Sequence, residues 1–428
     1  MTGRSSRAMQ LVSKLYVQYQ DVVRAYLSMI GGSVGRLVLS LVYFVCIANV
    51  MSIGDFGLFA TASATGVMVS RALAFGFMSP LYRVATVKPL LLGTYSLGFL
   101  ASALLSLPLI ALLCTIAYLA LFSADMAADV FFRFMVAEII CWRGLETVSN
   151  VLNGLGRFGR SAIMVVIGMA LRTATALAFL LSPWSSLDAW SGFYLASNVI
   201  SVTIAIIVFY PRVRLRWKPS LYMRRWADSV SVAGAEILFY VQSEFDKLVV
   251  LAIGGPAVSG IYAIIMRLAD LTALPVRSFN MLLVQNIMRS SAVIQTPRTR
   301  AAIELAIAAV SFLAIGSMGL YLWIIPAGLG RNVAEVSPYV LMVLFVPGFR
   351  NLIEYHSELL YATGRTVRRM FNLLVICLLK VALLAGLMKM TLDPATWVPD
   401  LNALYLGLYL VSLLLTYPAM ATLKPRAI

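Results

Sequence analysis

Long apolar stretches follow one another along this chain, and no polar segment between them is long enough to form a soluble domain. A helix that crosses a bilayer needs about 20 mostly apolar residues. The sequence therefore predicts an all-α polytopic membrane protein with twelve transmembrane helices. The predicted spans are 26–49, 55–79, 90–121, 128–153, 160–182, 188–210, 228–252, 257–287, 301–327, 335–361, 368–390 and 400–422.

The composition excludes several other classes of protein. Hydrophobic residues make up 61% of the 428 residues and charged residues only 12%, with a mean hydropathy of +0.90. A soluble domain is about half apolar and about a quarter charged. This chain is therefore not a soluble enzyme, a disordered chain or a disulfide scaffold. Its net charge of +16 does not indicate a nucleic-acid partner, because little water-exposed surface is available to bind one.

The positive charge lies in alternate connecting loops. If the N-terminus is cytoplasmic, 22 of the 34 Lys and Arg residues fall in cytoplasmic loops and termini, and the opposite loops hold only Arg331 and Lys389. Cytoplasmic loops are enriched in these residues. The split predicts a multi-pass protein of the plasma membrane with both termini in the cytoplasm. The basic loops are expected to contact anionic lipid headgroups.

The longest polar stretch, 211–226, divides the chain near its middle. It predicts five parts, listed in chain order: an interfacial N-terminal segment (1–24), an N-terminal six-helix bundle (25–210), a polybasic linker (211–226), a C-terminal six-helix bundle (227–423) and a short cytoplasmic tail (424–428).

The two halves repeat each other at two places. Gly57–Ala60 opens the second span, and the similar Gly260–Ala263 lies near the start of the eighth, 203 residues later. Leu152–Arg157 ends the fourth span, and Leu360–Arg365 ends the tenth, 208 residues later. Because each half has six spans, the repeat is parallel, with its axis along the membrane normal. Transporters that rock two bundles about a central site are built in this way.

Three places in the sequence resemble a known family. They are Ser52–Ala60, the segment Tyr240–Lys247 with the following Gly-Pro-x-x-x-Gly-Ile-Tyr-Ala, and the turn that ends the tenth span. Together with the topology, they resemble the multidrug/oligosaccharidyl-lipid/polysaccharide exporter superfamily, and within it the Wzx-type polysaccharide flippases.

The resemblance implies a V of two six-helix bundles, with spans 1, 2, 7 and 8 along the cleft. It also implies a bacterial inner-membrane flippase that moves undecaprenyl-pyrophosphate-linked oligosaccharides from the cytoplasmic to the periplasmic leaflet. Such a protein serves the synthesis of O-antigen, exopolysaccharide or capsule. Its expected partners are the lipid-linked oligosaccharide, anionic lipids, and a polysaccharide polymerase with its export machinery.

Eighteen charged residues lie at membrane depth, where each is costly and is expected to face protein or a wet cavity. Some have an opposite charge one turn away on their own helix, which favours structural pairing. These pairs are Arg143–Glu146, Arg267–Asp270 and Arg350–Glu354. Arg133 and Lys380 lie near helix ends and are expected to extend toward the interface.

Arginines at membrane depth are the candidate substrate ligands, because a guanidinium stays charged and binds phosphate oxygens through two hydrogen bonds. The structural alternative is an acidic partner on another helix or, for Arg267, Asp270 on its own helix. The first six spans hold five bases against two acids, so the N-terminal bundle is expected to be the anion-binding side. The candidates are Arg36, Arg71, Arg172, Arg267 and Arg277.

Three acids on the seventh span are candidates for ion coupling. Glu236 and Glu244 are eight residues apart and share a helix face, and Asp246 lies beside Lys247. A buried carboxylate that changes its protonation could couple to bundle rocking. The alternative is a structural pair made by Asp246 and Lys247 with the neighbouring spans. The coupling hypothesis predicts that Asp246→Asn abolishes ion-dependent transport.

Two other functions fit the sequence less well. A multidrug exporter of the same fold favours organic cations and needs an acid-dominated cleft. A membrane glycan polymerase or ligase needs sizeable periplasmic loops, which this chain lacks. The sequence has no G-x-x-x-x-G-K-[ST] motif, so ATP is not the direct energy source. We expect no enzyme activity, no cofactor and no metal, since His356 stands alone and the four cysteines lie in apolar stretches.

Overall fold

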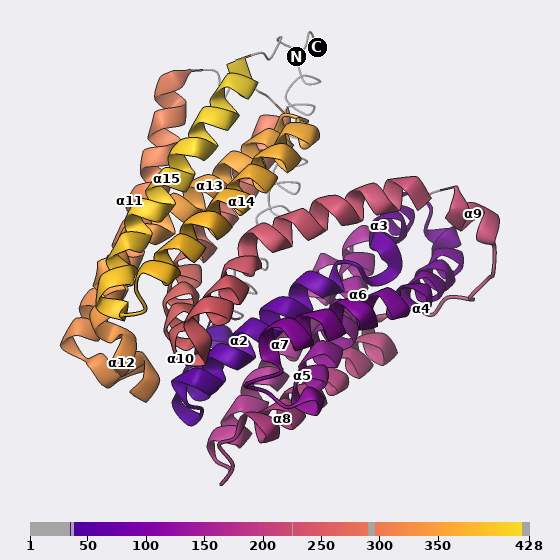
Figure 1. The fold of residues 1–428 in the computed structure, drawn as a ribbon. Helices are drawn as coiled ribbons and strands as arrows, with labels where there is room; N and C mark the ends of the chain where they lie inside the picture. The colour runs from indigo at the N-terminus through magenta and orange to yellow at the C-terminus, as the bar shows by residue number, and fades with distance from the viewer. Residues whose placement is uncertain (1–34, 36–37, 225, 290–295, 422–428) are drawn as a thin grey trace, which may run out of the picture.

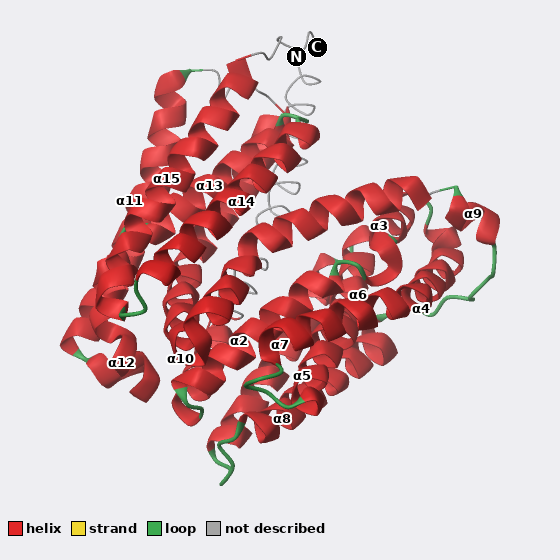
Figure 2. Cartoon of the chain, in the orientation of Figure 1, coloured by secondary structure: helices red, strands yellow, loops and turns green. Residues whose placement is uncertain are grey.

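The computed structural model describes residues 35, 38–224, 226–289 and 296–421. The predicted interfacial segment, the predicted tail and Arg36 lie outside these ranges. Helices connected by short loops account for nearly all of the described chain, and no strand occurs in it (Figure 2). Three helices begin at a hydroxyl cap that accepts the backbone N–H of the residue three positions on. The caps are Ser52, Ser186 and Thr296.

The N-terminal bundle begins with the helix Val38–Val50. It continues with α2 (Ile53–Ser70), η1 (Leu73–Gly76), α3 (Met78–Val87), η2 (Pro89–Leu91), α4 (Leu92–Ala117), η3 (Tyr118–Phe122), α5 (Ala128–Met135), η4 (Val136–Trp142), α6 (Arg143–Gly154), α7 (Phe158–Leu180), α8 (Leu187–Ile204) and η5 (Ala205–Phe209). The aromatic rings of Phe59, Trp190 and Tyr194 pack together in its core, with centroids 5.3 to 5.8 Å apart.

The short α9 (Pro219–Met223) lies in the linker. The C-terminal half consists of α10 (Trp226–Arg289), α11 (Pro297–Ile324), η7 (Pro326–Leu329), α12 (Arg331–Val340), η8 (Leu341–Val343), α13 (Val346–Ala362), α14 (Thr366–Met390) and α15 (Pro394–Ala421). α10 contains both the seventh and the eighth predicted span. They join at Gly255, whose φ of 75° and ψ of −179° interrupt the helix.

The described helices agree with the predicted set of spans. By length and apolar composition, eight of them can cross a membrane, and a ninth span is formed by the pair Arg331–Val343 and Val346–Ala362, bent by 66°. α10 counts once in this total although it contains two spans. The helical run from α5 to α6 corresponds to the predicted fourth span, but it carries five charged side chains, which lower its hydropathy.

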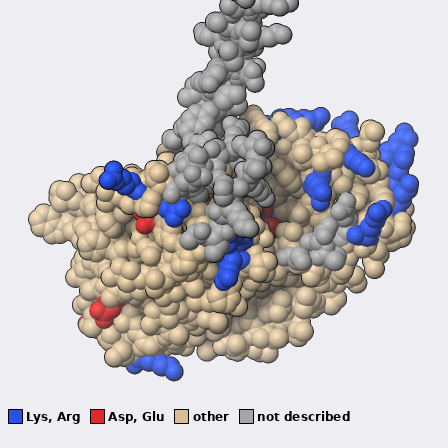
Figure 3. Space-filling view, turned by 90° about the horizontal axis from the view of Figure 1, so that it is seen from above, with Lys and Arg blue, Asp and Glu red and all other residues tan. Residues whose placement is uncertain are grey.

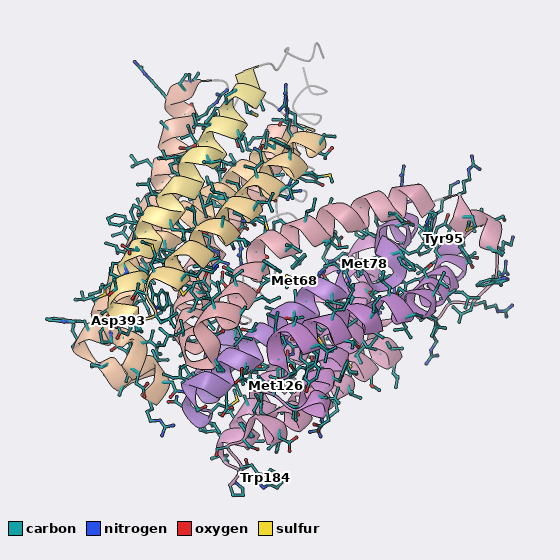
Figure 4. All side chains as sticks on the ribbon, viewed as in Figure 1. Met68, Met78, Tyr95, Met126, Trp184 and Asp393 are labelled. Atoms are coloured by element: carbon teal, nitrogen blue, oxygen red, sulfur yellow. The ribbon has the colours of Figure 1, made fainter. Side chains whose placement is uncertain are left out.

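The two bundles form a V that opens at the end of the molecule where α9 lies (Figure 1). Seen from this open end, the surface shows many Lys and Arg side chains and few Asp and Glu (Figure 3). Trp184, between α7 and α8, lies at the other end of the N-terminal bundle from Tyr95 (Figure 4). The open end of the V is therefore the basic end.

The internal repeat corresponds to equivalent turns in the two halves. Gly156 and Gly364 have φ values of 72° and 75°, in the left-handed region that favours glycine. In each turn the following arginine donates its backbone N–H to the carbonyl five residues earlier: Arg157 to Leu152 at 2.8 Å, and Arg365 to Leu360 at 2.9 Å. The fourth and tenth spans therefore end in the same way.

The other repeated element brings the two halves into contact. Gly57 on α2 and Gly260 on α10 face each other, and a Cβ atom added to Gly57 would lie 2.5 Å from the backbone nitrogen of Gly260. Next to them, the Thr61 and Ser259 hydroxyls share a hydrogen bond of 2.9 Å. Small residues allow membrane helices to approach closely, so this crossing forms the closed end of the V.

The second predicted span is broken between α2 and α3. Ala74, Phe75 and Gly76 have φ values of 57°, 47° and 74°. The Ser106 hydroxyl accepts the backbone N–H of Ala74 at 3.0 Å and supports the break. The first turns of α10 pack here, with the rings of Phe75 and Trp226 5.2 Å apart.

Candidate functional site

A cavity of about 540 Å³ lies between the bundles. The N-terminal half contributes the helix Val38–Val50, η4 and α7 to its wall, and the C-terminal half contributes α10, α13, α14 and α15. Five basic and three acidic side chains line the cavity, so its wall carries a net positive charge. The bases are Arg172, Arg267, Arg277, Arg350 and Lys380, and the acids are Glu244, Asp270 and Glu354.

Two of the lining arginines form no ion pair with a described carboxylate. Arg172, on α7, donates from Nε to Oδ1 of Asn198 at 3.0 Å, and its guanidinium lies 4.0 Å from the ring centroid of Trp142. Arg267, on α10, donates to the Ser40 hydroxyl at 2.6 Å. Both retain N–H groups that a ligand in the cavity can reach, and they come from opposite bundles.

The acids of the cavity are all neutralised by nearby bases. Asp270 accepts from Arg350 at 3.0 Å and lies 3.8 Å from Arg277. Arg277 also pairs with Glu354 at 3.1 Å. The predicted pairs along single helices, Arg267 with Asp270 and Arg350 with Glu354, are therefore wrong. The carboxylates turn toward arginines on the facing helix instead, because α10 and α13 pack against each other.

A second cavity of about 270 Å³ extends from the first toward the closed end of the V. Arg172, Glu244 and Arg267 line both cavities, and Phe56 and Phe59 of α2 give the second an apolar wall. Glu138 faces this second cavity and accepts hydrogen bonds from the hydroxyls of Ser63, at 2.6 Å, and Tyr194. The two cavities therefore adjoin each other, and the second is the smaller one.

Arg71 lies behind the cavity wall rather than on it. Its side chain is 3% exposed, and its NH1 lies 2.9 Å from the Glu146 carboxylate. Glu146 also binds Arg143 at 2.8 Å, which confirms the predicted pair on α6. Arg143 reaches Glu236 of α10 at 2.9 Å. These four side chains tie the first half of α10 to α2 and α6.

Of the ion-coupling candidates, Asp246 is the most deeply buried. Its Oδ2 lies 3.1 Å from the Lys380 ammonium, and the Tyr262 hydroxyl donates to it at 2.8 Å. Lys380 also donates to the carbonyl of Gln242 at 2.6 Å. The expectation that Lys380 extends to the interface is therefore wrong, because a buried carboxylate one helix away is the nearer partner. Glu244 pairs with Lys247 on its own helix.

The positions of the remaining charged side chains could not be predicted from the sequence. Arg133 pairs with Asp129 and Asp188 at the surface. Four of the five bases that line the large cavity come from α10, α13 and α14, so the N-terminal bundle is not the main source of positive charge there. The sequence did not predict Arg350 and Lys380 as lining residues. Arg350 has an acid one turn away on its own helix, and Lys380 lies near a predicted helix end, so each had a structural interpretation. No cluster of metal-binding side chains occurs among the described residues.

Comparison with known proteins identifies the fold. No protein-family model and no curated protein sequence matches the chain. Among solved structures, the chain is similar to an inward-facing multidrug resistance MATE family transporter of the MOP superfamily, with a TM-score of 0.64 and 13% identity over 91% of this chain and 96% of that one. It is also similar to MATE in complex with MaD3S, with a TM-score of 0.52 and 13% identity over 94% of this chain and 95% of that one. The structure of MATE in complex with MaL6 has a TM-score of 0.51 and 12% identity over 94% of this chain and 97% of that one.

These likenesses cover almost the whole chain, and at this level of identity they establish the architecture alone. The protein has the two-bundle, all-helical membrane fold of the MATE transporters.

Proposed function

We propose that the protein is a membrane transporter that flips a lipid-linked oligosaccharide with an anionic, pyrophosphate-type headgroup. The observation that carries this proposal is the pair Arg172 and Arg267, two guanidinium groups from opposite bundles that line both cavities without an acidic partner among the described residues. Guanidinium forks suit phosphate oxygens. A ligand bound by both arginines would draw the two bundles together.

The charge of the cavity supports an anionic ligand. Its three acids are paired with bases, and Lys380 is paired with Asp246, so the positive charge left on the wall belongs to Arg172 and Arg267. The cavity volume is in the range of small-ligand sites. It therefore suits the headgroup of a lipid-linked sugar, with the hydrocarbon chain left in the surrounding bilayer.

The basic open end of the V supports the orientation. Because Lys and Arg accumulate on the cytoplasmic side, we place this end and both termini in the cytoplasm of a bacterial inner membrane. The V then opens inward, where lipid-linked sugars are assembled. Transport would proceed by alternating access, driven by an ion or by the membrane potential.

The linker supports anionic lipids as partners. Arg212, Arg214, Arg216 and Lys218 are all exposed. The Tyr222 hydroxyl, which donates to the carbonyl of Thr94 at 2.8 Å, fixes this stretch against α4. A polymerase with its export machinery remains a proposed partner that follows from the proposed cargo.

A multidrug exporter is the second candidate. The solved relatives include a multidrug resistance transporter, and aromatic side chains line the cavity beside the charges, among them Tyr43, Trp142 and Tyr240. Aromatic faces bind organic cations. The two candidates differ in the charge of the cargo, which gives a direct test.

Arg172→Gln and Arg267→Gln should each lower the flipping of a fluorescent pyrophosphate-linked sugar in liposomes by about 10- to 100-fold. A hydrogen bond to a charged group contributes about 1.5–3 kcal/mol, and 1.4 kcal/mol corresponds to a factor of ten. The measurement is the initial rate of leaflet exchange at matched protein density.

Arg133→Gln is the matched control, since Arg133 pairs with Asp129 and Asp188 away from the cavity. It should flip the cargo at the wild-type rate. Wild-type rates in both cavity variants would contradict the proposal. If the wild-type protein exports an organic cation but does not flip the lipid-linked sugar, the drug exporter is favoured.

A further inference from the structure

A buried cluster in the C-terminal bundle lies apart from both cavities. Its centre is His356 on α13, the single histidine of the chain, with a side chain that is 1% exposed. The Nε2 atom of His356 lies 3.0 Å from Oε1 of Glu304 on α11. Its Nδ1 atom lies 2.9 Å from the hydroxyl of Ser412 on α15. One imidazole therefore joins three helices.

Glu304 accepts further hydrogen bonds from two tyrosines of α15. The hydroxyl of Tyr409 donates to Oε2 at 2.7 Å, and that of Tyr417 donates to Oε1. The ring of Tyr409 stacks on the imidazole, with centroids 5.7 Å apart and an interplanar angle of 17°. These donors suit an ionised carboxylate, which accepts hydrogen bonds and donates none.

The cluster can hold one more proton without moving a heavy atom. In the neutral form, Nε2–H donates to Glu304 and Nδ1 accepts the Ser412 hydroxyl. In the protonated form, Nδ1–H donates to Ser412 Oγ, and the serine hydroxyl hydrogen rotates away. The net charge of the His356–Glu304 pair changes from −1 to 0.

The other charges of the neighbouring helices lie beside the cluster or pair with other residues. Arg300 of α11 lies over the ring of Tyr417, 5.4 Å from its centroid. The facing charges of α10 and α14 pair with other acids of α13. These pairs are Arg277–Glu354 and Arg369–Glu358, and the remaining titratable side chain beside the cluster is Tyr355 of α13.

We propose that His356 and Glu304 form a proton-binding site and that a proton is the ion coupled to transport. The site is joined to the cavity through α13, which also carries Arg350 and Glu354 on the cavity wall. Proton uptake adds an ion pair between α13 and α11 and so changes how firmly α13 is held. The coupling rests on the proposed transport function, whereas the proton site does not.

The single histidine allows a direct measurement. Protein with a histidine-free tag and isotope-labelled histidine gives one imidazole NMR signal, which can be followed in detergent from about pH 5 to 8, where histidines titrate. We expect this signal to titrate. In Glu304→Gln, its midpoint should move toward lower pH by about one unit or more, because the variant removes the carboxylate that stabilises the imidazolium.

Ser412→Ala is a milder variant and should shift the midpoint in the same direction by less. Asn351→Ala is the matched control, because Asn351 joins the same two helices through a 2.8 Å hydrogen bond to Ser311 without a titratable group. It should leave the midpoint unchanged. An imidazole that stays in one protonation state over the range, or a midpoint insensitive to Glu304→Gln, would overturn the proton site.

Coupling is tested separately with His356→Gln, which keeps a hydrogen-bonding side chain but cannot hold the extra proton. Its flipping rate in liposomes should lose the dependence on an imposed pH gradient that the wild type shows. An unchanged dependence would overturn the coupling. If the wild type flips no lipid-linked sugar while the NMR titration behaves as expected, the proposed function fails and the proton site stands.

Discussion

Gly260→Ala should destabilise the protein by about 3 kcal/mol, at the upper end of the range for overpacked sites. The added Cβ atom would lie 2.0 Å from the Ile53 carbonyl oxygen and 2.6 Å from the Ile53 side chain. Because the nearest atom belongs to the backbone of α2, rotation of a side chain cannot relieve the clash, and the helices must separate. Thermal unfolding in detergent, followed by tryptophan fluorescence, measures the loss.

Gly234→Ala provides the control on the same helix. A Cβ atom at Gly234 has no neighbour within 4 Å, and alanine is favoured over glycine within a helix by about 1 kcal/mol. This variant should unfold at the same or a higher temperature than the wild type. Equal stability of the two variants would contradict the close crossing of α2 and α10.

Asp246→Asn should destabilise the protein by about 3–5 kcal/mol, the usual cost of breaking a buried ion pair from one side. Asp246 and Lys380 are each less than 5% exposed and lie 3.1 Å apart. The asparagine retains an acceptor for the Tyr262 hydroxyl, so most of the loss comes from the ammonium left without a counter-charge. The midpoint temperature of thermal unfolding in detergent, compared with that of the wild type, measures the loss of stability.

The double variant Asp246→Asn/Lys380→Met separates structure from ion coupling. Replacing a buried pair with uncharged side chains is often close to neutral, so the double variant should recover most of the lost stability. If it also recovers ion-dependent flipping, Asp246 is a structural residue. Stable protein that flips cargo without ion dependence would instead support the role of Asp246 in coupling. A single variant as stable as the wild type would contradict the buried pair.

The spans and the repeat could be predicted because they depend on local properties. Hydropathy over 20 residues is the condition for crossing a bilayer. The Gly-Arg turns at Gly156 and Gly364 are local C-caps whose glycines need a left-handed φ. The equivalence of Gly57 and Gly260 was also visible in the sequence, but their direct contact was not, because the register between two helices is set by the whole bundle.

The partners of the charged side chains could not be predicted. Spacing along one helix gave the correct pair for Arg143 and the wrong one for Arg350, although both had an acid within one turn. The difference lies in the facing helix, which offers Asp270 to Arg350. The His356–Glu304 site was missed for the same reason, since its two residues lie on different helices and are 52 positions apart in the sequence.

The packing of α10 determines which part of the chain would bend in the proposed alternating access. Covalently, the halves meet in the polybasic stretch, but Tyr222 holds that stretch on α4. The first turns of α10 also rest on the N-terminal bundle through Trp226 and Glu236. α14 contacts α10 at Phe239, where the Arg369 guanidinium lies 5.9 Å from the ring centroid, and at Gln242. The mechanical boundary of the molecule therefore falls inside a continuous helix. In the proposed alternating access, the bundles would move by bending α10 in this region, while the linker stays fixed on α4.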